Sequence, residues 1–187
     1  MKFHIETERL VLREIRDGDL EGMYELDSNP KVHKYLGNKP ITTKEQAASY
    51  IKSIKSQYIE RGIGRFAIIE KATGTFVGWS GIKFNTGEKE SIGDKKDFYD
   101  IGYRLIENFW RKGYARESAE AALAFAFNEL KLETIVGTAE TENIASNKIL
   151  KKIGLQYSET FAYKDVMLHW YTLNNKDYAK KMSGMRR

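Results

Sequence analysis

The stretch from Asp97 to Leu130 constrains the fold more than any other part of this 187-residue chain. Its first part, Phe98–Ile106, has the residue pattern of a β-strand, and a turn around Glu107 and Asn108 follows. The rest predicts a helix with one apolar face, because small or apolar residues recur there at steps of three and four: Ala115, Ala119, Ala122, Ala126 and Leu130. The sequence therefore predicts a strand–turn–helix unit whose helix lies close against a sheet through its small side chains.

The start of this helix has the features of an anion site. The first backbone N–H groups of a helix lack partners within it, and here they lie near Gly113. Arg111, Lys112 and Arg116 place positive charge where the helix dipole disfavours cations, which suggests a negative ligand such as a pyrophosphate. An ordinary helix with a solvated basic end is the alternative, because one glycine with basic neighbours is a weak signal. Gly113 stands alone, so neither a nucleoside-triphosphate loop nor a dinucleotide fingerprint is indicated.

Three motifs, in order along the chain, resemble those of a known family. Ile101–Leu105 followed by Trp110–Ala115 looks like the central motif of the GNAT superfamily of acetyl-coenzyme A-dependent N-acetyltransferases. The common form of that motif is Gln/Arg-x-x-Gly-x-Gly/Ala, and a tryptophan in its first position is usual in the Rim-type branch, the ribosomal-protein N-terminal acetyltransferases. Asn143–Ser146 and the apolar run after it are similar to that branch's N-x-x-S motif. The opening Glu6–Arg13 resembles its T-x-R-L-x-L-R start.

This resemblance implies the GNAT fold, an α/β (α+β) architecture. A mixed central sheet of about seven strands would be splayed at the cofactor site and flanked by helices. The order of predicted elements agrees, beginning with a strand at Arg9–Arg13 and including a long helix that starts at a capping box over Thr43–Gln46. We expect residues 1–175 to form a single domain and residues 176–187 to form a basic, frayed tail.

The resemblance also assigns the contacts to acetyl-CoA. Backbone groups of Tyr103, Arg104 and Leu105 would lie along the pantetheine arm, and the N–H of Leu105 or of a neighbour would polarise the thioester carbonyl. The side chain of Arg104 is interpreted as solvent-facing. Backbone N–H groups of six residues would hold the pyrophosphate: Arg111, Lys112, Gly113, Tyr114, Ala115 and Arg116.

Asn143 and Ser146 form a second candidate site, because their spacing places both on one side of a helix start. The resemblance makes them contacts to the cofactor arm and makes Ser146 a candidate catalytic acid for the departing thiolate. Many GNAT enzymes use a tyrosine at the position of Leu150 as the acid instead. Because this chain has a leucine there, Ser146 becomes a stronger candidate for the acid. The simpler alternative is that Asn143 or Thr141 caps the helix and Ser146 faces solvent. Tyrosine hydroxyls elsewhere, or water, are further sources of the proton.

Asp100 is the candidate catalytic base, because related sequences often carry an acidic residue at this position. A carboxylate beside the thioester could accept a proton through water. An exposed strand carboxylate is an equally good interpretation, and Glu70 and Glu14 are weaker candidates for the base. Trp79 and Tyr35 either line the acceptor pocket or pack in the core.

Composition sets compatible limits. The chain has no cysteine, which excludes disulfides, thiolate metal sites and thiol catalysis, and the scattered His4, His33 and His169 predict no metal site. The net charge of +5 could favour an anionic partner such as coenzyme A or RNA, or could reflect a mixed solvated surface. No apolar stretch reaches membrane-spanning length and Met1–Ile5 lacks a signal-peptide core, so a cytoplasmic protein is expected.

The expected function is transfer of an acetyl group from acetyl-CoA to a primary amine by direct attack in a ternary complex. The acceptor would be a protein N-terminus or a small molecule, and a homodimer is possible. The alternative is a non-catalytic coenzyme A-binding sensor or interaction domain, which the absence of a tyrosine at Leu150 keeps open. Binding to RNA or the ribosome through the basic surplus is a third interpretation, although the sequence shows no clear nucleic-acid site.

Overall fold

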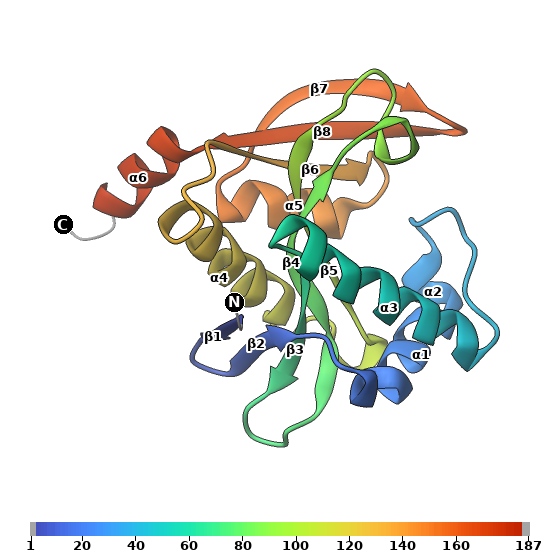
Figure 1. Cartoon of the computed structure of the whole chain (residues 1–187). Coiled ribbons are helices and arrows are strands. Elements are labelled where there is room, and N and C mark those ends of the chain that lie inside the picture. The colour runs from blue at the N-terminus through green and yellow to red at the C-terminus, as the bar shows by residue number, and fades with distance from the viewer. Residues whose placement is uncertain (1–2, 185–187) are drawn as a thin grey trace.

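One sheet organises the molecule. The computed structural model, which describes residues 3–184, has eight strands in the order β1-β2-β3-β4-β5-β6-β8-β7 (Figure 1). All described strand pairs are antiparallel except β5 with β6, which are parallel. This mixed sheet confirms the predicted fold class. The strands are β1 (His4–Glu6), β2 (Leu10–Glu14), β3 (Arg65–Glu70), β4 (Phe76–Asn85), β5 (Phe98–Leu105), β6 (Thr134–Glu140), β7 (Gln156–Tyr163) and β8 (Val166–Asn174).

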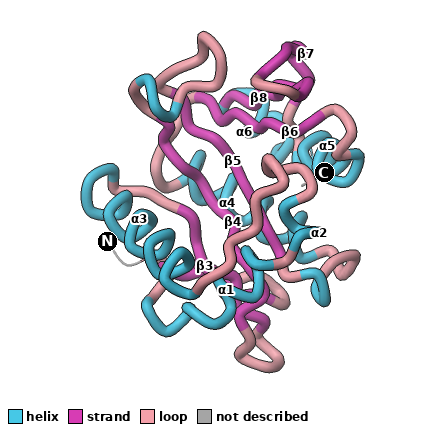
Figure 2. Tube along the Cα trace, turned by 90° about the vertical axis from the view of Figure 1, so that its right-hand side faces the viewer, coloured by secondary structure: helices cyan, strands magenta, loops and turns pink. Residues whose placement is uncertain are grey.

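Helices cover both faces of the sheet. α1 and α3 pack on one face in a cluster that includes Met23, Ile51 and Trp79. α4 and α5 pack on the other face, where Ile82 and Ile101 contribute from the strands. In Figure 2, β3, β4 and β5 run side by side through the middle of the molecule, with α3 next to them. The helices are α1 (Leu20–Ser28), α2 (Pro30–His33), α3 (Lys44–Arg61), α4 (Tyr114–Asn128), α5 (Ile144–Ile153) and α6 (Asn175–Gly184).

Local sequence signals explain where the helices on the first face begin. Thr43 caps α3 by accepting from the N–H of Gln46, and the Gln46 side chain accepts from the N–H of Thr43, which confirms the predicted capping box. Pro30 ends α1 but also opens the short helix α2 as its first residue, with Asn29 accepting from the N–H of Lys31 at 2.9 Å.

The close packing of α4 on the sheet follows from its small residues. Ala119, Ala122 and Ala126 are fully buried beside Leu123 and Phe127, as the periodicity predicts. Alanine side chains let the helix axis approach the strands, and they lose no side-chain entropy on burial. The start of α4 is thereby fixed next to the end of β5.

Two parts of the chain differ from the sequence-based expectation. The sheet has eight strands rather than about seven, because His4–Glu6 adds β1 to the edge of β2. The prediction of a frayed tail is wrong for residues 176–184, which belong to α6, and residues 185–187 lie outside the described residues. Tyr178 of α6 stacks on Phe127 with ring centres 4.8 Å apart. One buried aromatic side chain holds this otherwise polar helix on the domain.

None of the helices formed by residues 3–184 is long and apolar enough to span a bilayer. Across the same residues, no three histidine, aspartate or glutamate side chains gather closely enough to hold a metal ion.

Candidate active site

β5 and β6 separate beyond a single register pair. In the described part of the chain these parallel strands pair only at Asp100 and Val136, whereas β5 pairs with β4 along its whole length. On the β4 side, the N–H of Ile106 donates to the carbonyl of Val77 at 3.1 Å. Alternate residues of a strand direct their backbone groups to opposite neighbours. The pairing of Ile106 therefore fixes which residues of β5 face the gap.

The open edge of β5 carries backbone groups that are available to a ligand. Tyr103 and Leu105 direct theirs away from β4 and toward the gap, whereas the backbone of Arg104 is directed toward β4, contrary to the predicted contact with pantetheine. The carbonyl of Leu105 accepts a hydrogen bond from Nε1 of Trp110 at 2.8 Å. The N–H of Leu105 and both backbone groups of Tyr103 remain to pair with an extended amide chain, as an added strand would.

The turn before α4 directs backbone N–H groups toward one place. Gly113 precedes the helix with a φ of 85°, and Arg111 has a φ of 62°. Glycine adopts such left-handed conformations readily, whereas any other residue is strained there. Among the described residues, no side chain caps the start of α4. Its first N–H groups are therefore free to bind an anion.

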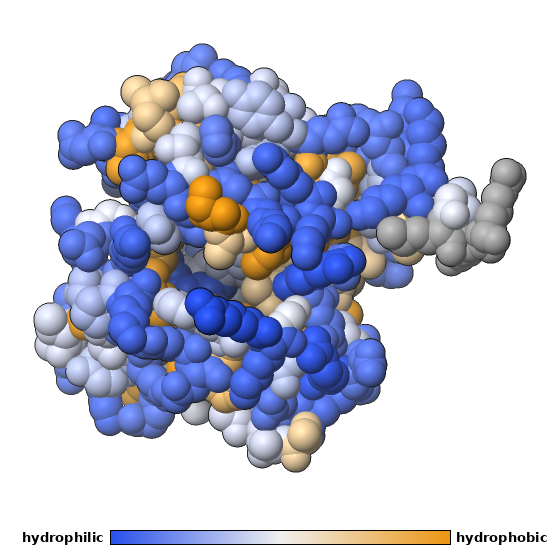
Figure 3. Space-filling model, turned by 180° about the vertical axis from the view of Figure 1, so that it is seen from behind, coloured by the Kyte–Doolittle hydropathy of each residue, from blue (hydrophilic) through white to orange (hydrophobic). Residues whose placement is uncertain are grey.

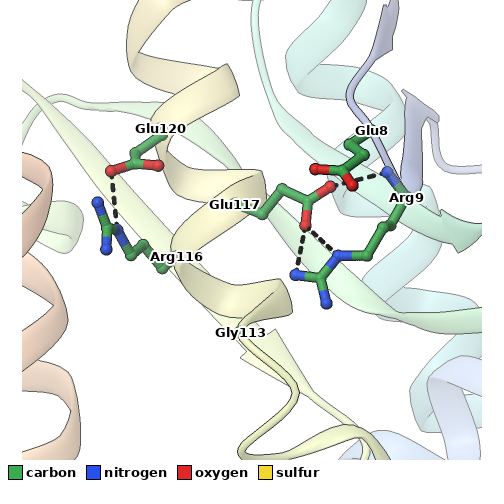
Figure 4. A pocket seen from close by; sticks show the side chains of 6 residues that line it. All are labelled: Glu8, Arg9, Gly113, Arg116, Glu117 and Glu120. Carbon is green, nitrogen blue, oxygen red and sulfur yellow. Dashed lines mark hydrogen bonds and ion pairs between the residues drawn. The ribbon is translucent and has the colours of Figure 1, made fainter. Parts of the chain in front are cut away.

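A surface depression of about 350 Å³ lies beside this turn (Figure 4). In the figure, Arg9 and Glu117 point toward one another at one side, while Arg116 turns to Glu120 and donates to it from Nε at 2.9 Å. The charges in the depression are thus largely paired with one another, so the uncapped N–H groups are its unsatisfied feature. The lining residues are Glu8, Arg9, Gly113, Arg116, Glu117 and Glu120.

Glu117 clamps the N-terminal segment onto α4. Its carboxylate accepts from Oγ1 of Thr7 at 2.6 Å, and from the backbone N–H and Nε of Arg9 at 2.9 and 2.7 Å. The Arg9 guanidinium also donates to the carbonyl of Lys112 at 2.9 Å and lies 4.7 Å from the centre of the Tyr114 ring. Burial alone would raise the pKa of Glu117, but the hydrogen bonds from Thr7 and Arg9 together lower it. The clamp holds the turn in place from its outer side.

Two hydroxyl groups, those of Tyr103 and Ser146, meet between β5 and α5. Their oxygen atoms lie 3.0 Å apart, and the Tyr103 hydroxyl also donates to the Ser146 carbonyl at 3.2 Å. Between these two oxygen atoms either hydroxyl can be the donor. Burial raises the pKa of Tyr103, so its phenol keeps its proton at neutral pH. Two proton-carrying groups therefore stand next to the open edge of β5.

The neighbouring residues of α5 determine how Ser146 is placed. Asn143 caps the helix by accepting from the N–H of Ser146 at 3.1 Å, so Asn143 rather than Thr141 is its cap. Ser146 is half-buried rather than turned to solvent. Leu150 is buried against Gly137 in the core.

Asp100 is held on both of its carboxylate oxygens. Nη2 of Arg65 donates to one at 2.7 Å and Nδ2 of Asn85 to the other at 2.8 Å. Asp100 also lies five residues before Leu105 on the same strand, about 16 Å away at about 3.3 Å per residue. These contacts give the predicted role of Asp100 as the base no support and make it a structural ion-pair partner.

On the face of the sheet that α1 and α3 cover, two arginines flank the indole of Trp79. The guanidinium carbons of Arg65 and Arg104 lie 5.3 and 5.0 Å from the ring centre. Arg65 crosses β5 at Gly102, where a Cβ would lie 2.8 Å from that carbon. Arg104 forms an ion pair with Asp27 of α1 and is not turned to solvent as predicted. Trp79 therefore belongs both to the core cluster under α1 and α3 and to a charged layer that borders it.

Further polar groups border this layer. Nε2 of His33 lies 3.6 Å from Asp27, and burial followed by the charge of Arg104 lowers the pKa of His33, so the ring is neutral at pH 7. Burial raises the pKa of Tyr50 on α3. Within residues 3–184, Nε1 of Trp79 and both ring nitrogens of His33 are buried without hydrogen-bond partners. Such groups are rare in native proteins, so these nitrogens are candidates for hydrogen bonds with a bound molecule.

The surface is hollowed on the side opposite to the view of Figure 1. There a depression lies at mid-height, and mostly hydrophilic residues surround it (Figure 3).

Comparisons with known proteins identify the family. Residues 9–156 match the family model described as an acetyltransferase (GNAT) domain. The chain belongs to the GNAT acetyltransferase family. This acetyltransferase is 33% identical over 152 residues to the N-acetyltransferase YoaA of Bacillus subtilis, covering 81% of this chain and 82% of YoaA. It matches the crystal structure of a GNAT-family acetyltransferase from Bacillus anthracis with a TM-score of 0.75 and 26% identity, covering 93% and 99% of the two chains.

The acetyltransferase also resembles RimL, a ribosomal L7/L12 alpha-N-protein acetyltransferase that has been solved in complex with coenzyme A. The TM-score is 0.74 at 15% identity, over 92% of this chain and 98% of RimL, and at this identity the likeness shows the fold alone. The predicted family, fold and enzyme class are thereby confirmed. Enzymes of this family use acetyl-CoA.

The residues of the acetyltransferase fit acetyl-CoA at both ends. The open edge of β5 offers an N–H and a carbonyl at the spacing of a strand, which suits the amides of pantetheine. The uncapped start of α4 suits the pyrophosphate, and a Cβ at Gly113 would lie 3.2 Å from Nη2 of Arg9, so the turn has little room for a larger residue.

Several residues of the site were not predicted from the sequence. Only backbone groups of Tyr103 were assigned to the site, although this tyrosine lies within the motif and tyrosine hydroxyls were among the possible proton sources. The clamp was missed because Glu117 and Arg9 are 108 residues apart. Asp27 and His33 were also missed, because they lie in helices that carry no motif.

Proposed function

We propose that this acetyltransferase transfers the acetyl group of acetyl-CoA to a primary amine by direct attack within a ternary complex. The gap between β5 and β6 carries this proposal, because it joins free backbone groups at Tyr103 and Leu105 to an uncapped helix start at Gly113. Acetyl-CoA supplies the reactive thioester. The residues of this chain bind it, orient it and handle the protons.

Binding uses backbone groups along the gap. The N–H groups from Arg111 to Arg116 hold the pyrophosphate, with the helix dipole of α4 adding to the attraction. Tyr103 pairs with the pantetheine amides and so places the thioester beside the N–H of Leu105. Arg9 and Glu117 hold the turn in the shape that the pyrophosphate requires.

The chemistry then needs one oxyanion donor and one acid. The amine nitrogen forms a bond to the acetyl carbon, the carbon–sulfur bond breaks, the amine loses a proton and the sulfur gains one. The N–H of Leu105 donates to the carbonyl oxygen as negative charge develops on it. Ser146 gives a proton to the leaving sulfur and regains one from Tyr103. Water takes the proton lost by the amine and returns a proton to Tyr103.

The acceptor is a protein N-terminus or a small-molecule amine. Thiol release from acetyl-CoA, measured across a panel of amines and N-terminal peptides, tests the proposal. Release that depends on both substrates and on Ser146 would support it. Tight binding of coenzyme A without release on any acceptor would favour the non-catalytic sensor, which the buried leucine at position 150 makes the second candidate.

A further inference from the structure

Arg104 has hydrogen-bonding capacity that the protein does not use. Within residues 3–184 its guanidinium donates one hydrogen bond, from Nη1 to Asp27, out of the five N–H groups that an arginine carries. Its side chain is 18% exposed, so the remaining donors are neither sealed in the core nor fully hydrated. Arg65, which flanks the same indole, differs because it is bound to Asp100 and to the carbonyl of Gly81 and is 8% exposed.

Most of the unpaired groups around Arg104 are donors. Nε1 of Trp79, whose ring the Arg104 guanidinium faces, is buried and has no acceptor among the described residues. Neutral His33 has two unpaired ring nitrogens, of which one carries a proton and the other can only accept. A place where buried and half-buried donors outnumber acceptors favours a ligand group that only accepts hydrogen bonds, and a carboxylate is the commonest such group.

The position of Arg104 ties this group to the reaction. Arg104 precedes Leu105, whose N–H is the proposed donor to the thioester carbonyl. Successive side chains of a strand point to opposite faces, so Arg104 projects on the face of α1 and α3 while Leu105 packs toward α4. An amine that reaches the acetyl carbon from the face of α1 and α3 comes from the side of the sheet that carries the Arg104 guanidinium.

We propose that the acceptor carries an anionic group close to its amine, and that Arg104 and Trp79 bind that group. This inference rests on the proposed function. The layer of Asp27, His33, Arg65, Trp79 and Arg104 is called the acceptor side below. Asp27 holds one edge of the Arg104 guanidinium and leaves the other edge to the substrate. The positive charge also disfavours an ammonium ion next to it, which assists loss of the amine proton. The anionic group is a carboxylate of a small molecule or the side chain of an acidic residue near a protein N-terminus.

The test compares pairs of acceptors that differ only in a carboxylate or a carboxamide. One arm uses small amines of each kind, and the other uses peptides with aspartate or asparagine at the second position, so the two arms distinguish the sources. For wild type we expect a higher kcat/KM for the carboxylate member than for the carboxamide member in one arm. Arg104→Gln should lower the ratio of these two kcat/KM values by about ten- to hundredfold, because a charge-assisted pair is lost. The change should appear in the KM for the acceptor, with the KM for acetyl-CoA unchanged. Comparing ratios between wild type and variant cancels the intrinsic reactivity of the amines.

Two variants separate direct binding from a structural role. Asp27→Asn breaks the same ion pair but keeps the guanidinium, so it should lower Tm as Arg104→Gln does while keeping the preference. Arg61→Gln removes a similarly exposed arginine from an ion pair with Glu90 and should leave the preference unchanged. Equal preference for both members in wild type, or equal loss of preference in Asp27→Asn, would overturn the assignment of Arg104. Absence of thiol release with every acceptor would instead overturn the proposed function.

Discussion

The two faces of β5 are built in different ways. The face toward α4, called the cofactor side here, takes its backbone donors from one stretch that ends at Arg116, and its charged groups are paired within the protein. The acceptor side takes side chains from separate helices and strands and leaves donors on Trp79 and His33 unpaired. A local stretch of backbone can bind the cofactor, acetyl-CoA. Selection of the acceptor instead depends on side chains that the fold brings together.

The largest expected effect comes from a substitution in the turn of the cofactor side. Gly113→Glu should abolish binding of acetyl-CoA measured by calorimetry, because it adds a side chain and a negative charge where the pyrophosphate is proposed to bind. Gly87→Glu is the matched control, since Gly87 has a similar φ of 70° in open space. Unchanged affinity in Gly113→Glu would refute the pyrophosphate assignment.

Loss of the proposed acid should be the next largest effect. Ser146→Ala should lower kcat by one to a few powers of ten at saturating substrates, since general acids contribute about that much. Tyr103→Phe should cause a smaller decrease because it removes only the partner that returns the proton. Ser49→Ala, at an exposed helical serine, is the control. A rate within about twofold of wild type would leave Ser146 a binding role alone.

The clamp gives a moderate effect that belongs to the cofactor side only. Arg9→Ala should weaken acetyl-CoA binding by about tenfold and leave kcat nearly unchanged, because it releases Glu117 and the carbonyl of Lys112. It should not change the selectivity among acceptors that Arg104 is proposed to set. Arg16→Ala removes an exposed arginine and serves as the control. A matching drop in kcat would mean that the clamp also positions the reacting groups.

The smallest effect is a pH dependence of stability on the acceptor side. Burial lowers the pKa of His33 below its ordinary value of 6.5, so the unfolded chain binds this proton more readily than the folded one. The stability contributed by neutral His33 is complete above about 6.5 and is lost as the pH falls toward the lowered value. Urea midpoints at pH 7.5 and 5.5 should therefore differ less in His33→Gln than in wild type or in His4→Gln, where the histidine is exposed. An equal difference in all three proteins would assign the pH dependence to other groups.

The same contrast explains how much could be predicted from the sequence. The strand–turn–helix unit and the capping of α3 were predictable because each depends on residues a few positions apart. The pairing of Arg104 with Asp27 crosses 77 residues, and that of Asp100 with Arg65 crosses 35, so neither has a local pattern. For that reason Arg104 was interpreted as solvent-facing and Asp100 as a free carboxylate.

Short elements were missed for a different reason. β1 has three residues, too few to show a period, and its place in the sheet depends on pairing with β2. α6 is polar except for a few residues, and the stacking of Tyr178 on Phe127 holds it to the domain. In both cases tertiary contacts decide the local structure.

The clamp between Arg9 and Glu117 has a consequence for how the protein folds. It closes a loop of more than one hundred residues, so the edge of the sheet that is synthesised first receives its final support only after α4 has been made. Contacts of such long range slow folding and leave the first two strands among the last regions to become protected from hydrogen exchange. A ligand that rigidifies the turn at Gly113 would therefore also protect the amides of β2 from hydrogen exchange, because the clamp connects the two.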